Sequence, residues 1–279
     1  MLLKAKLYII KKISKLGNKK GVKMKKLSYL SSLLLVPFAV TLTSCSTPSQ
    51  NQDTAQTSSP EVVETKAESG DTDYLTSLGL MKGHLMVAQQ LIEQGKYEEA
   101  EPHVGHPVEE LYGTIESELN KRNVTDFKMT LNQFHDGIKT NPKSEQMKEL
   151  YKNSMTAIDQ AIAAVPTEKL QSPETVLPVI NGLLSTANAE YQAAIANNKF
   201  VELIEYQDSM GFVAYAEELY QPITDTMSQQ YPEKHEIITT SLEKLKTAWP
   251  SVNAPETPVM SPEKVDELVT KIQESSTLQ

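Results

Sequence analysis

The sequence predicts an all-α fold, a helical bundle of two packed helical halves. From position 73 onward, apolar residues recur at spacings of three and four, which is the period of helices with one buried face. No segment alternates polar and apolar residues as a half-buried strand would. Prolines and glycines gather at the ends of the periodic segments, where they stop helices. About 200 residues follow position 73, which is enough to bury a sizeable core.

The first 45 residues contain ten lysines and no acidic residue, and an apolar run covers positions 27–42. A basic start, an apolar middle and a small-residue exit are typical of a secretory signal peptide, which is expected at residues 1–44. The apolar run is shorter than the ~20 residues that a membrane-spanning helix needs. Met24 opens a signal peptide of ordinary length and is an alternative start of translation.

The apolar run exits through Leu42-Thr43-Ser44-Cys45, and Cys45 is the only cysteine in the chain. The tetrapeptide resembles the lipobox of bacterial lipoproteins, which implies acylation (palmitate) of Cys45 and a membrane anchor there. The alternative is an ordinary cleavage site that adjoins a cysteine. The resemblance implies a place in the bacterial cell envelope, facing the periplasm or the exterior. Ser46, and not aspartate, follows Cys45, which resembles the sorting signal of outer-membrane lipoproteins and implies the outer membrane if the cell has two membranes.

Residues 46–72 are rich in Ser, Thr, Gln, Pro and Glu and hold almost no large apolar side chain. Such a segment cannot bury enough surface to offset its chain entropy, so residues 45–72 are predicted to be a flexible linker. Removing the ten lysines of the signal from the 27 basic residues leaves 17 against 36 acidic residues, a net charge of −19. This charge disfavours nucleic acid as a partner and favours cations or a basic protein. It also serves simply to keep a secreted protein in solution.

An N-terminal half is predicted over residues 73–166. Gly95 breaks its first helix, Pro107 suits the first turn of its second, and Pro166 stops its last. The predicted helices cover Leu75–Gln94, His106–Lys121, Thr125–Thr140 and Ser144–Val165.

A C-terminal half is predicted over residues 167–279, with a kink at Pro222 in its second helix. Gly211 in the middle of that helix costs about 1 kcal/mol relative to alanine, which suggests that another helix packs closely there. The predicted helices cover residues 172–198, 200–230, 235–249 and 261–274.

Three of the five histidines fall within 23 positions, His84, His103 and His106, and Glu109 and Glu110 follow them. A helix–turn–helix can return the later two histidines to the first, and residues three or four apart on a helix share a face. Imidazoles and carboxylates together suit a divalent ion such as iron, zinc or copper. These five residues are therefore the candidate ligands of a metal site. The alternative is that the histidines cap helices or satisfy buried carbonyl groups.

A second candidate site is acidic and consists of Glu190, Glu202, Glu205 and Asp208. The last three follow one another at spacings of three, so they form a row on one helical face. Such a row binds cations where it faces a bundle interior, although a solvated acidic face is its commoner meaning. The two candidate sites would serve as one if the halves pack together.

Other features argue against catalysis. The sequence has no Gly-x-Ser-x-Gly, phosphate-binding glycine loop, Cys-x-x-Cys-His or His-Glu-x-x-His motif, so we expect no enzyme, nucleotide or haem.

His135 lies beside Phe134 on an apolar-faced helix and is expected to be exposed at the edge of that face. His235 is expected on the surface at a helix start.

Two stretches resemble iron-associated proteins. His106-Pro107-Val108-Glu109 is similar to the His-x-x-Glu signature of imelysin-like periplasmic proteins, which are all-α, often lipoproteins, and associated with iron uptake. The segment from Glu190-Tyr191 through Glu205-Tyr206 to Gly211-Phe212-Val213 resembles the extracytoplasmic helical segment of some bacterial iron permeases. The permeases' own Arg-Glu-x-x-Glu motif is missing here. The resemblances imply iron or another divalent metal, handled outside the cytoplasm, with His106 and Glu109 as the matching positions.

The expected function is therefore metal binding by a lipid-anchored, extracytoplasmic protein that acts in uptake of iron or another divalent metal. The expected partner is a metal transporter or another envelope protein. The rival interpretation is a non-catalytic envelope scaffold that binds another protein through an acidic helical face. An imelysin-like peptidase is a third interpretation, which rests on one four-residue motif.

Overall fold

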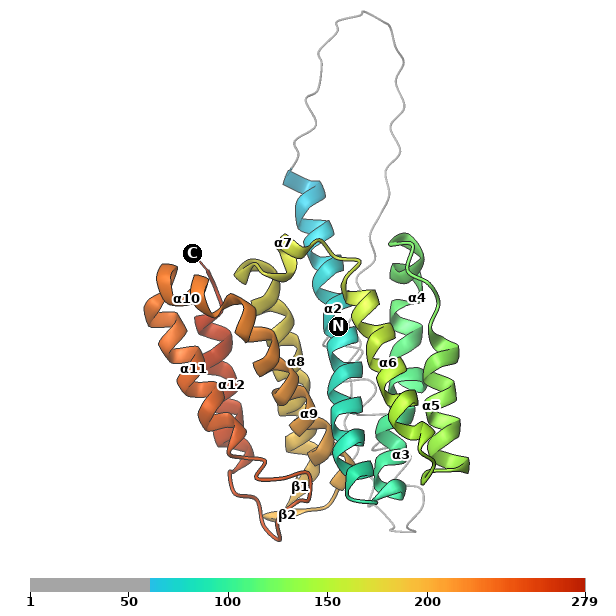
Figure 1. The fold of residues 1–279 in the computed structure, drawn as a ribbon. Coiled ribbons are helices and arrows are strands. Elements are labelled where there is room, and N and C mark those ends of the chain that lie inside the picture. Colours follow the sequence, from blue (N-terminus) through green and yellow to red (C-terminus); the bar gives the residue numbers. More distant parts are fainter. Residues whose placement is uncertain (1–60, 279) are drawn as a thin grey trace, which may run out of the picture. The chain divides into compact units, whose positions relative to one another are not determined.

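Helices dominate the computed structural model, which describes the backbone of residues 61–278 and the side chains of residues 70–278 (Figure 1). The all-α prediction is confirmed. The signal peptide, Cys45 and the linker up to residue 60 lie outside the described residues. The helical elements are α2 (Glu61–Glu93), α3 (Tyr97–His106), the π-helical turn η1 (Pro107–Leu111), α4 (Tyr112–Lys121), α5 (Lys128–Thr140), α6 (Gln146–Ile162), α7 (Thr167–Leu170), α8 (Pro173–Ala194), α9 (Leu203–Tyr220), the 3-10 turn η2 (Gln221–Ile223), α10 (Thr224–Gln230), α11 (Pro232–Lys246) and α12 (Pro262–Ser275).

Helix α2 is the central element. It contacts α3 and α6 on one side and α8 and α9 on the other, so it joins an earlier and a later group of helices (Figure 1). Leu78, Met81, Leu85 and Leu91 of α2 are each completely buried. A helix that is apolar on several faces must be covered on several faces, which places α2 in the interior.

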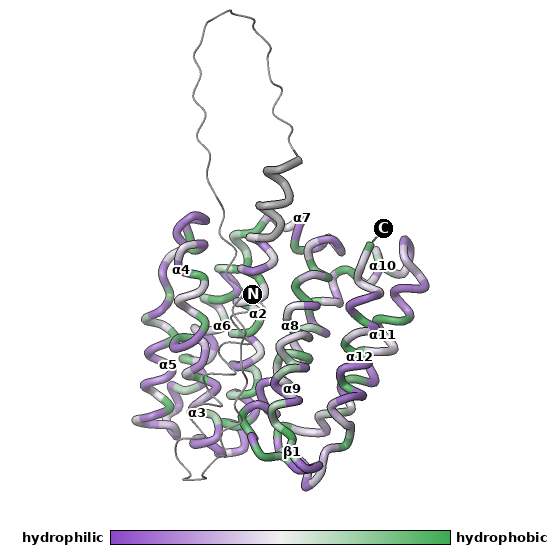
Figure 2. Tube along the Cα trace, turned by 180° about the vertical axis from the view of Figure 1, so that it is seen from behind, coloured by the Kyte–Doolittle hydropathy of each residue, from purple (hydrophilic) through white to green (hydrophobic). Residues whose placement is uncertain are grey.

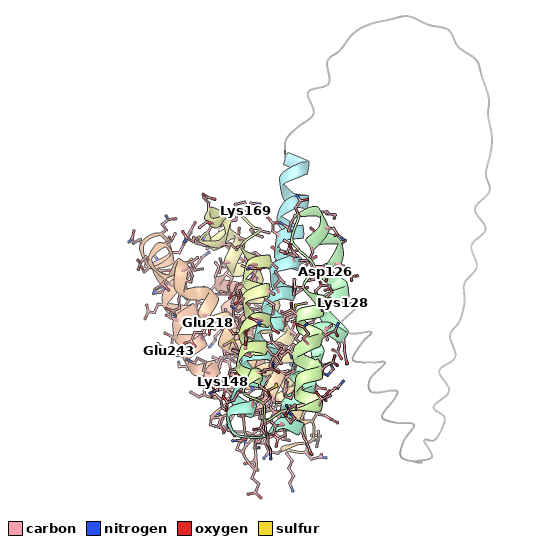
Figure 3. All side chains as sticks on the ribbon, turned by 45° about the vertical axis from the view of Figure 1, so that its right-hand side comes forward. Asp126, Lys128, Lys148, Lys169, Glu218 and Glu243 are labelled. Atoms are coloured by element: carbon pink, nitrogen blue, oxygen red, sulfur yellow. The ribbon has the colours of Figure 1, made fainter. Side chains whose placement is uncertain are left out.

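Further helices pack on the outside of each of the two groups. Helix α5 packs on α3 and α6, while α12 packs on α8 and α11. Hydrophobic stretches follow the inner helices α2 and α8, whereas α5 and α11 carry more hydrophilic residues (Figure 2). Charged side chains such as Lys148, Glu218 and Glu243 lie exposed on the outside (Figure 3). Among residues 61–278, no helix is both long and apolar enough to cross a membrane.

The predicted linker is too long at its C-terminal end, because α2 is already helical from Glu61. Asp71 ties this part of α2 to the body of the protein. Its carboxylate accepts hydrogen bonds from Arg122 Nη2 at 2.6 Å and from Lys169 Nζ at 2.7 Å. The Arg122 guanidinium also lies over the ring of Tyr74, 4.6 Å from its centroid. Partners far away in the sequence therefore order a stretch whose composition alone predicts a linker.

The second helix starts earlier than predicted. Helix α3 begins at Tyr97, nine residues before the expected start, and contains Pro102 in its interior. Ala100, His103 and Val104 are buried, so the buried face already exists ahead of the expected first turn. His103 consequently lies on the same helix as His106.

A short β-ribbon separates α8 from α9. The sequence predicts instead that the first helix of the C-terminal half continues to residue 198. Strand β1 (Ile195–Ala196) pairs antiparallel with β2 (Lys199–Phe200). The two asparagines between them, Asn197 and Asn198, have φ angles of 53° and 57°. Two consecutive left-handed residues form the tight turn that suits a two-residue hairpin, and asparagine tolerates that conformation. The predicted break at Pro222 is present, as the turn η2 between α9 and α10.

Candidate metal centre

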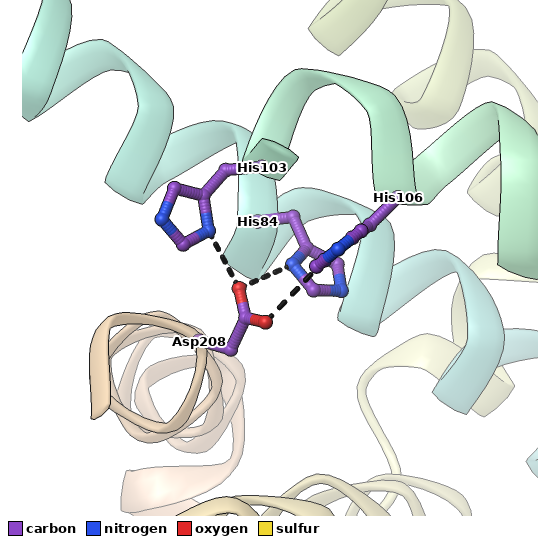
Figure 4. Close-up of side chains that lie close together, drawn as sticks. All are labelled: His84, His103, His106 and Asp208. Atoms are coloured by element: carbon purple, nitrogen blue, oxygen red, sulfur yellow. Dashed lines mark hydrogen bonds and ion pairs between the residues drawn. The ribbon is translucent and has the colours of Figure 1, made fainter. Parts of the chain in front are cut away.

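Three histidines and one aspartate meet in the interior of the protein. His84 comes from α2, His103 and His106 from α3, and Asp208 from α9 (Figure 4). One potential ligand atom from each of the four lies within 4.8 Å of all the others. Among the residues whose side chains are described, this is the group of His, Cys, Asp and Glu that could hold a metal ion.

A contact between two glycines sets the spacing of the helices that carry His84 and Asp208. A β-carbon on Gly211 of α9 would lie 2.2 Å from the carbonyl oxygen of Gly83 on α2. A β-carbon on Gly83 would in turn lie 2.7 Å from Cδ1 of Phe212. Neither position has room for a side chain, so the close packing that Gly211 suggests is present. His84 directly follows Gly83, and Asp208 lies about one turn before Gly211, so this contact brings the imidazole and the carboxylate together.

Helix α3 supplies the other two imidazoles from one face, because His103 and His106 are three residues apart. Gly105 lies between them, and a β-carbon there would come within 2.8 Å of His135 Nε2. The π-helical turn η1 begins directly after His106. Turns of this kind are rare and occur frequently at functional sites.

The Asp208 carboxylate is the centre of the hydrogen bonding. Its Oδ1 lies 2.7 Å from Nδ1 of His84 and 2.6 Å from Nδ1 of His103. Its Oδ2 lies 3.4 Å from Nδ1 of His106. The side chain of His106 is 13% exposed, against 7% or less for the other three. Access from solvent is therefore greatest at His106.

Burial and the neighbouring charges set the protonation states. Burial is the largest influence on His84 and lowers the pKa of its imidazole, although Asp208 acts in the opposite direction. Burial alone would raise the pKa of Asp208, but His84 and His103 together hold it well below its usual range. Near neutral pH the site therefore combines an ionised carboxylate with a neutral His84 imidazole, the forms that bind metal ions.

The structure does not bring Glu109 and Glu110 to this cluster, so their prediction as ligands needs correction. Pro107 and Val108 occupy the buried positions of η1, and both glutamates that follow are exposed. The Glu109 carboxylate instead lies 3.6 Å from His135 Nδ1.

Of the second candidate site, only Asp208 belongs to the cluster. Glu202 precedes α9 and is exposed, and Glu190 lies on α8. Glu205 is buried at 7% exposure but is not among the grouped ligands. The row therefore contributes a single carboxylate, to the same place as the three histidines.

The two remaining histidines take part in other contacts. His135 is buried at 5% exposure, contrary to the expectation of an exposed edge, and its Nε2 lies 2.7 Å from Glu101 Oε1. Packing of α5 against α3 covers that edge. His235 is partly exposed near the start of α11, where its ring stacks on Tyr220.

A family model described as the iron permease-associated 4-helix bundle domain matches residues 166–278. The matched stretch runs from α7 to α12 and includes Asp208, whereas the three clustered histidines precede it. It also contains the segment that resembles iron permeases in the sequence. No curated protein and no solved structure matches the chain. The similarity covers less than half of the chain and associates its C-terminal helices with iron permeases.

Proposed function

We propose that the protein binds a divalent transition-metal ion through His84, His103, His106 and Asp208 and acts in the uptake of iron or a similar metal. The observation that carries the proposal is the meeting of three imidazoles and one carboxylate, from three different helices, within 4.8 Å of one another. The sequence distances between α9 and the other two helices are large, so only the folded protein creates this site.

The chemistry of the donors selects the class of ion. Imidazole nitrogens suit zinc, copper, iron and nickel, whereas magnesium and calcium prefer sites made of oxygen. A carboxylate adds one negative charge, which a divalent ion more than balances. These residues therefore fit a borderline transition-metal ion and disfavour a hard cation.

The number of protein donors supports binding rather than catalysis. Closed zinc sites use four protein ligands, whereas catalytic sites keep one position open for water or substrate. His84, His103, His106 and Asp208 supply four. We therefore propose that the metal is cargo, held and passed on, and that no reaction takes place at it.

The family similarity supports iron as the expected cargo. Residues 166–278 match a domain associated with iron permeases, which suggests a link to a metal transporter. The proposal further includes an acyl anchor at Cys45 and a place in the cell envelope outside the cytoplasm. An anchored protein would hold its metal close to a transporter in a membrane.

Calorimetric titration of the full-length chain, purified in detergent, tests the proposal. Zinc, copper and anaerobic ferrous iron are expected to bind at one site per chain, and magnesium and calcium are expected not to compete. A His84→Ala, His106→Ala double variant should lose this binding. His235→Ala is the matched control, because His235 lies outside the cluster, and it should bind like the wild type. Wild-type protein that takes up no metal, or a double variant with unchanged affinity, would leave the acidic scaffold as the better interpretation.

A further inference from the structure

A buried glutamine connects the cluster to two other parts of the protein. Gln207 precedes Asp208 on α9 and has no exposed surface. Its Oε1 lies 2.9 Å from Nε2 of His103. Its Nε2 donates hydrogen bonds to Oε2 of Glu99 at 3.3 Å and to the carbonyl oxygen of Val252 at 3.2 Å. The amide therefore contacts α3, through His103 and Glu99, and the loop after α11, through Val252.

These partners fix which way the amide points. The Glu99 carboxylate and the Val252 carbonyl both accept hydrogen bonds, so the NH2 group of Gln207 must face them. Turning the amide over would place its oxygen against two other acceptors. The Gln207 oxygen consequently faces His103.

This orientation also fixes the protonation of one ring nitrogen. An amide oxygen accepts and does not donate, so His103 Nε2 must carry the proton of their hydrogen bond. The other nitrogen, Nδ1, faces Asp208 Oδ1 at 2.6 Å. Whether a proton or a metal ion lies between His103 and Asp208, Nε2 keeps its own proton and Nδ1 is the atom turned to the site.

We propose that Gln207 is a positioning residue of the metal centre, which holds His103 so that Nδ1 is the ligand atom. The inference rests on the proposed function, because it concerns how one of its ligands is oriented. Metal-binding histidines generally donate their second N–H to a carboxylate, carbonyl or water, which fixes both the tautomer and the ring plane. Here the acceptor is a side-chain amide, and Glu99 and Val252 hold that amide in turn.

Glu99 is itself held in place from the surface. Lys96 Nζ donates to its two carboxylate oxygens at 2.9 and 3.2 Å. The resulting series of contacts runs from Lys96 through Glu99 and Gln207 to His103. A side chain that only filled space would need none of these three polar contacts at Gln207.

The substitution Gln207→Met tests the inference, because methionine has a similar volume and lacks both the acceptor and the donors. Loss of such an outer contact is expected to weaken zinc binding about 10- to 100-fold, with the stoichiometry unchanged. The matched control is Ser209→Ala, which alters an equally buried residue of α9. Ser209 bonds to Trp249 Nε1 and the Tyr206 carbonyl rather than to the cluster, so its loss should lower stability and leave zinc affinity unchanged.

Nuclear magnetic resonance of the histidine rings supplies a readout that a purely structural role would not change. In wild-type protein His103 Nε2 is expected to carry a proton with and without zinc, and in Gln207→Met that proton should exchange rapidly or be absent. A wild-type spectrum without a proton on His103 Nε2 overturns the inference, even if the variant fails to fold. So does a folded Gln207→Met variant that binds zinc as tightly as the wild type. Absence of zinc binding by the wild type is a different result, which overturns the proposed function itself.

Discussion

Gly83 and Gly211 touch backbone to backbone where α2 crosses α9, and a β-carbon on Gly211 would lie 2.2 Å from the carbonyl oxygen of Gly83. His84 adjoins the first glycine, and Asp208 precedes the second by about one turn. The close approach of the two helices at these glycines and the hydrogen bond between His84 and Asp208 are therefore parts of one arrangement.

The substitution Gly211→Ala is expected to force these helices apart. Overpacking of this kind typically costs about 1–3 kcal/mol of unfolding free energy, and zinc binding should weaken as Asp208 moves away from His84. Urea denaturation and calorimetry measure the two effects. Gly113→Ala is the control, because a β-carbon on this exposed residue of α4 meets nothing within 4 Å. It should be neutral or stabilise by no more than about 1 kcal/mol. Equal effects of the two substitutions would show that the glycine contact does not set the site.

Removing the charge of Asp208 should abolish most of the metal affinity. Asp208→Asn keeps the shape of the side chain but supplies a neutral amide in place of the anionic ligand. Glu205→Gln is the control, because Glu205 is a buried acid on the same helix outside the cluster. Calorimetric titration with zinc measures both variants. A similar loss in both would mean that the general acidity of α9 attracts the ion, without a role for Asp208 as a ligand.

Metal affinity should depend on pH in a defined direction. Burial lowers the pKa of His84 below its usual value of 6.5, and the histidines keep Asp208 ionised. Protons therefore compete weakly for His84 and Asp208 at neutral pH, and competition for the imidazoles increases as the pH falls below about 6.5. Zinc affinity measured from pH 8 to pH 5 should decrease as the pH falls, most steeply below about 6.5. Affinity that stays constant over this range would argue against imidazole ligands.

The lowered pKa of His84 also makes the stability of the metal-free protein depend on pH. Because the pKa of His84 is lower in the folded protein, the unfolded chain takes up a proton first as the pH falls through 6.5. The free energy of unfolding should then decrease in that window. The contribution of Asp208, whose pKa is also lowered, is present above its unfolded value of 3.8 and is lost only at more acidic pH.

Much of the site follows from the sequence, because His84, His103 and His106 lie close together along the chain. A helix, a turn and a second helix are sufficient to unite them. The sequence alone does not distinguish Asp208 from Glu202 and Glu205, which share its row. Which of the three acids reaches the histidines depends on how α9 is rotated against α2. That rotation is seen in the contact between His84 and Asp208, which are 124 positions apart. Gly211 was the local signal that a close crossing occurs there.

The expectations for Glu109, Glu110 and His135 are incorrect because contacts between helices decide which side chains are buried. Glu109 and Glu110 are exposed because the buried positions of η1 belong to Pro107 and Val108. His135 is buried because α3 covers its side of α5, which the period of α5 alone does not reveal. In each case a contact between helices decides the outcome, while the presence of helices themselves follows from local periodicity.

The proposed membrane anchor has its own test. Cys45→Ser removes the thiol that an acyl chain would modify, so the protein should move from the membrane fraction to the soluble fraction of its native cell. Fractionation followed by immunoblotting measures this. Ser44→Gly leaves a small residue before the cysteine and serves as the control. A Cys45→Ser protein that stays with the membrane would argue against lipidation at this residue.

A crystal structure of zinc-soaked protein, with an anomalous difference map at the zinc edge, tests the metal centre most directly. The arrangement of His84, His103, His106 and Asp208 predicts one strong anomalous peak enclosed by these four side chains. A map with zinc only at surface carboxylates, and none among the three imidazoles, would contradict the proposed metal site.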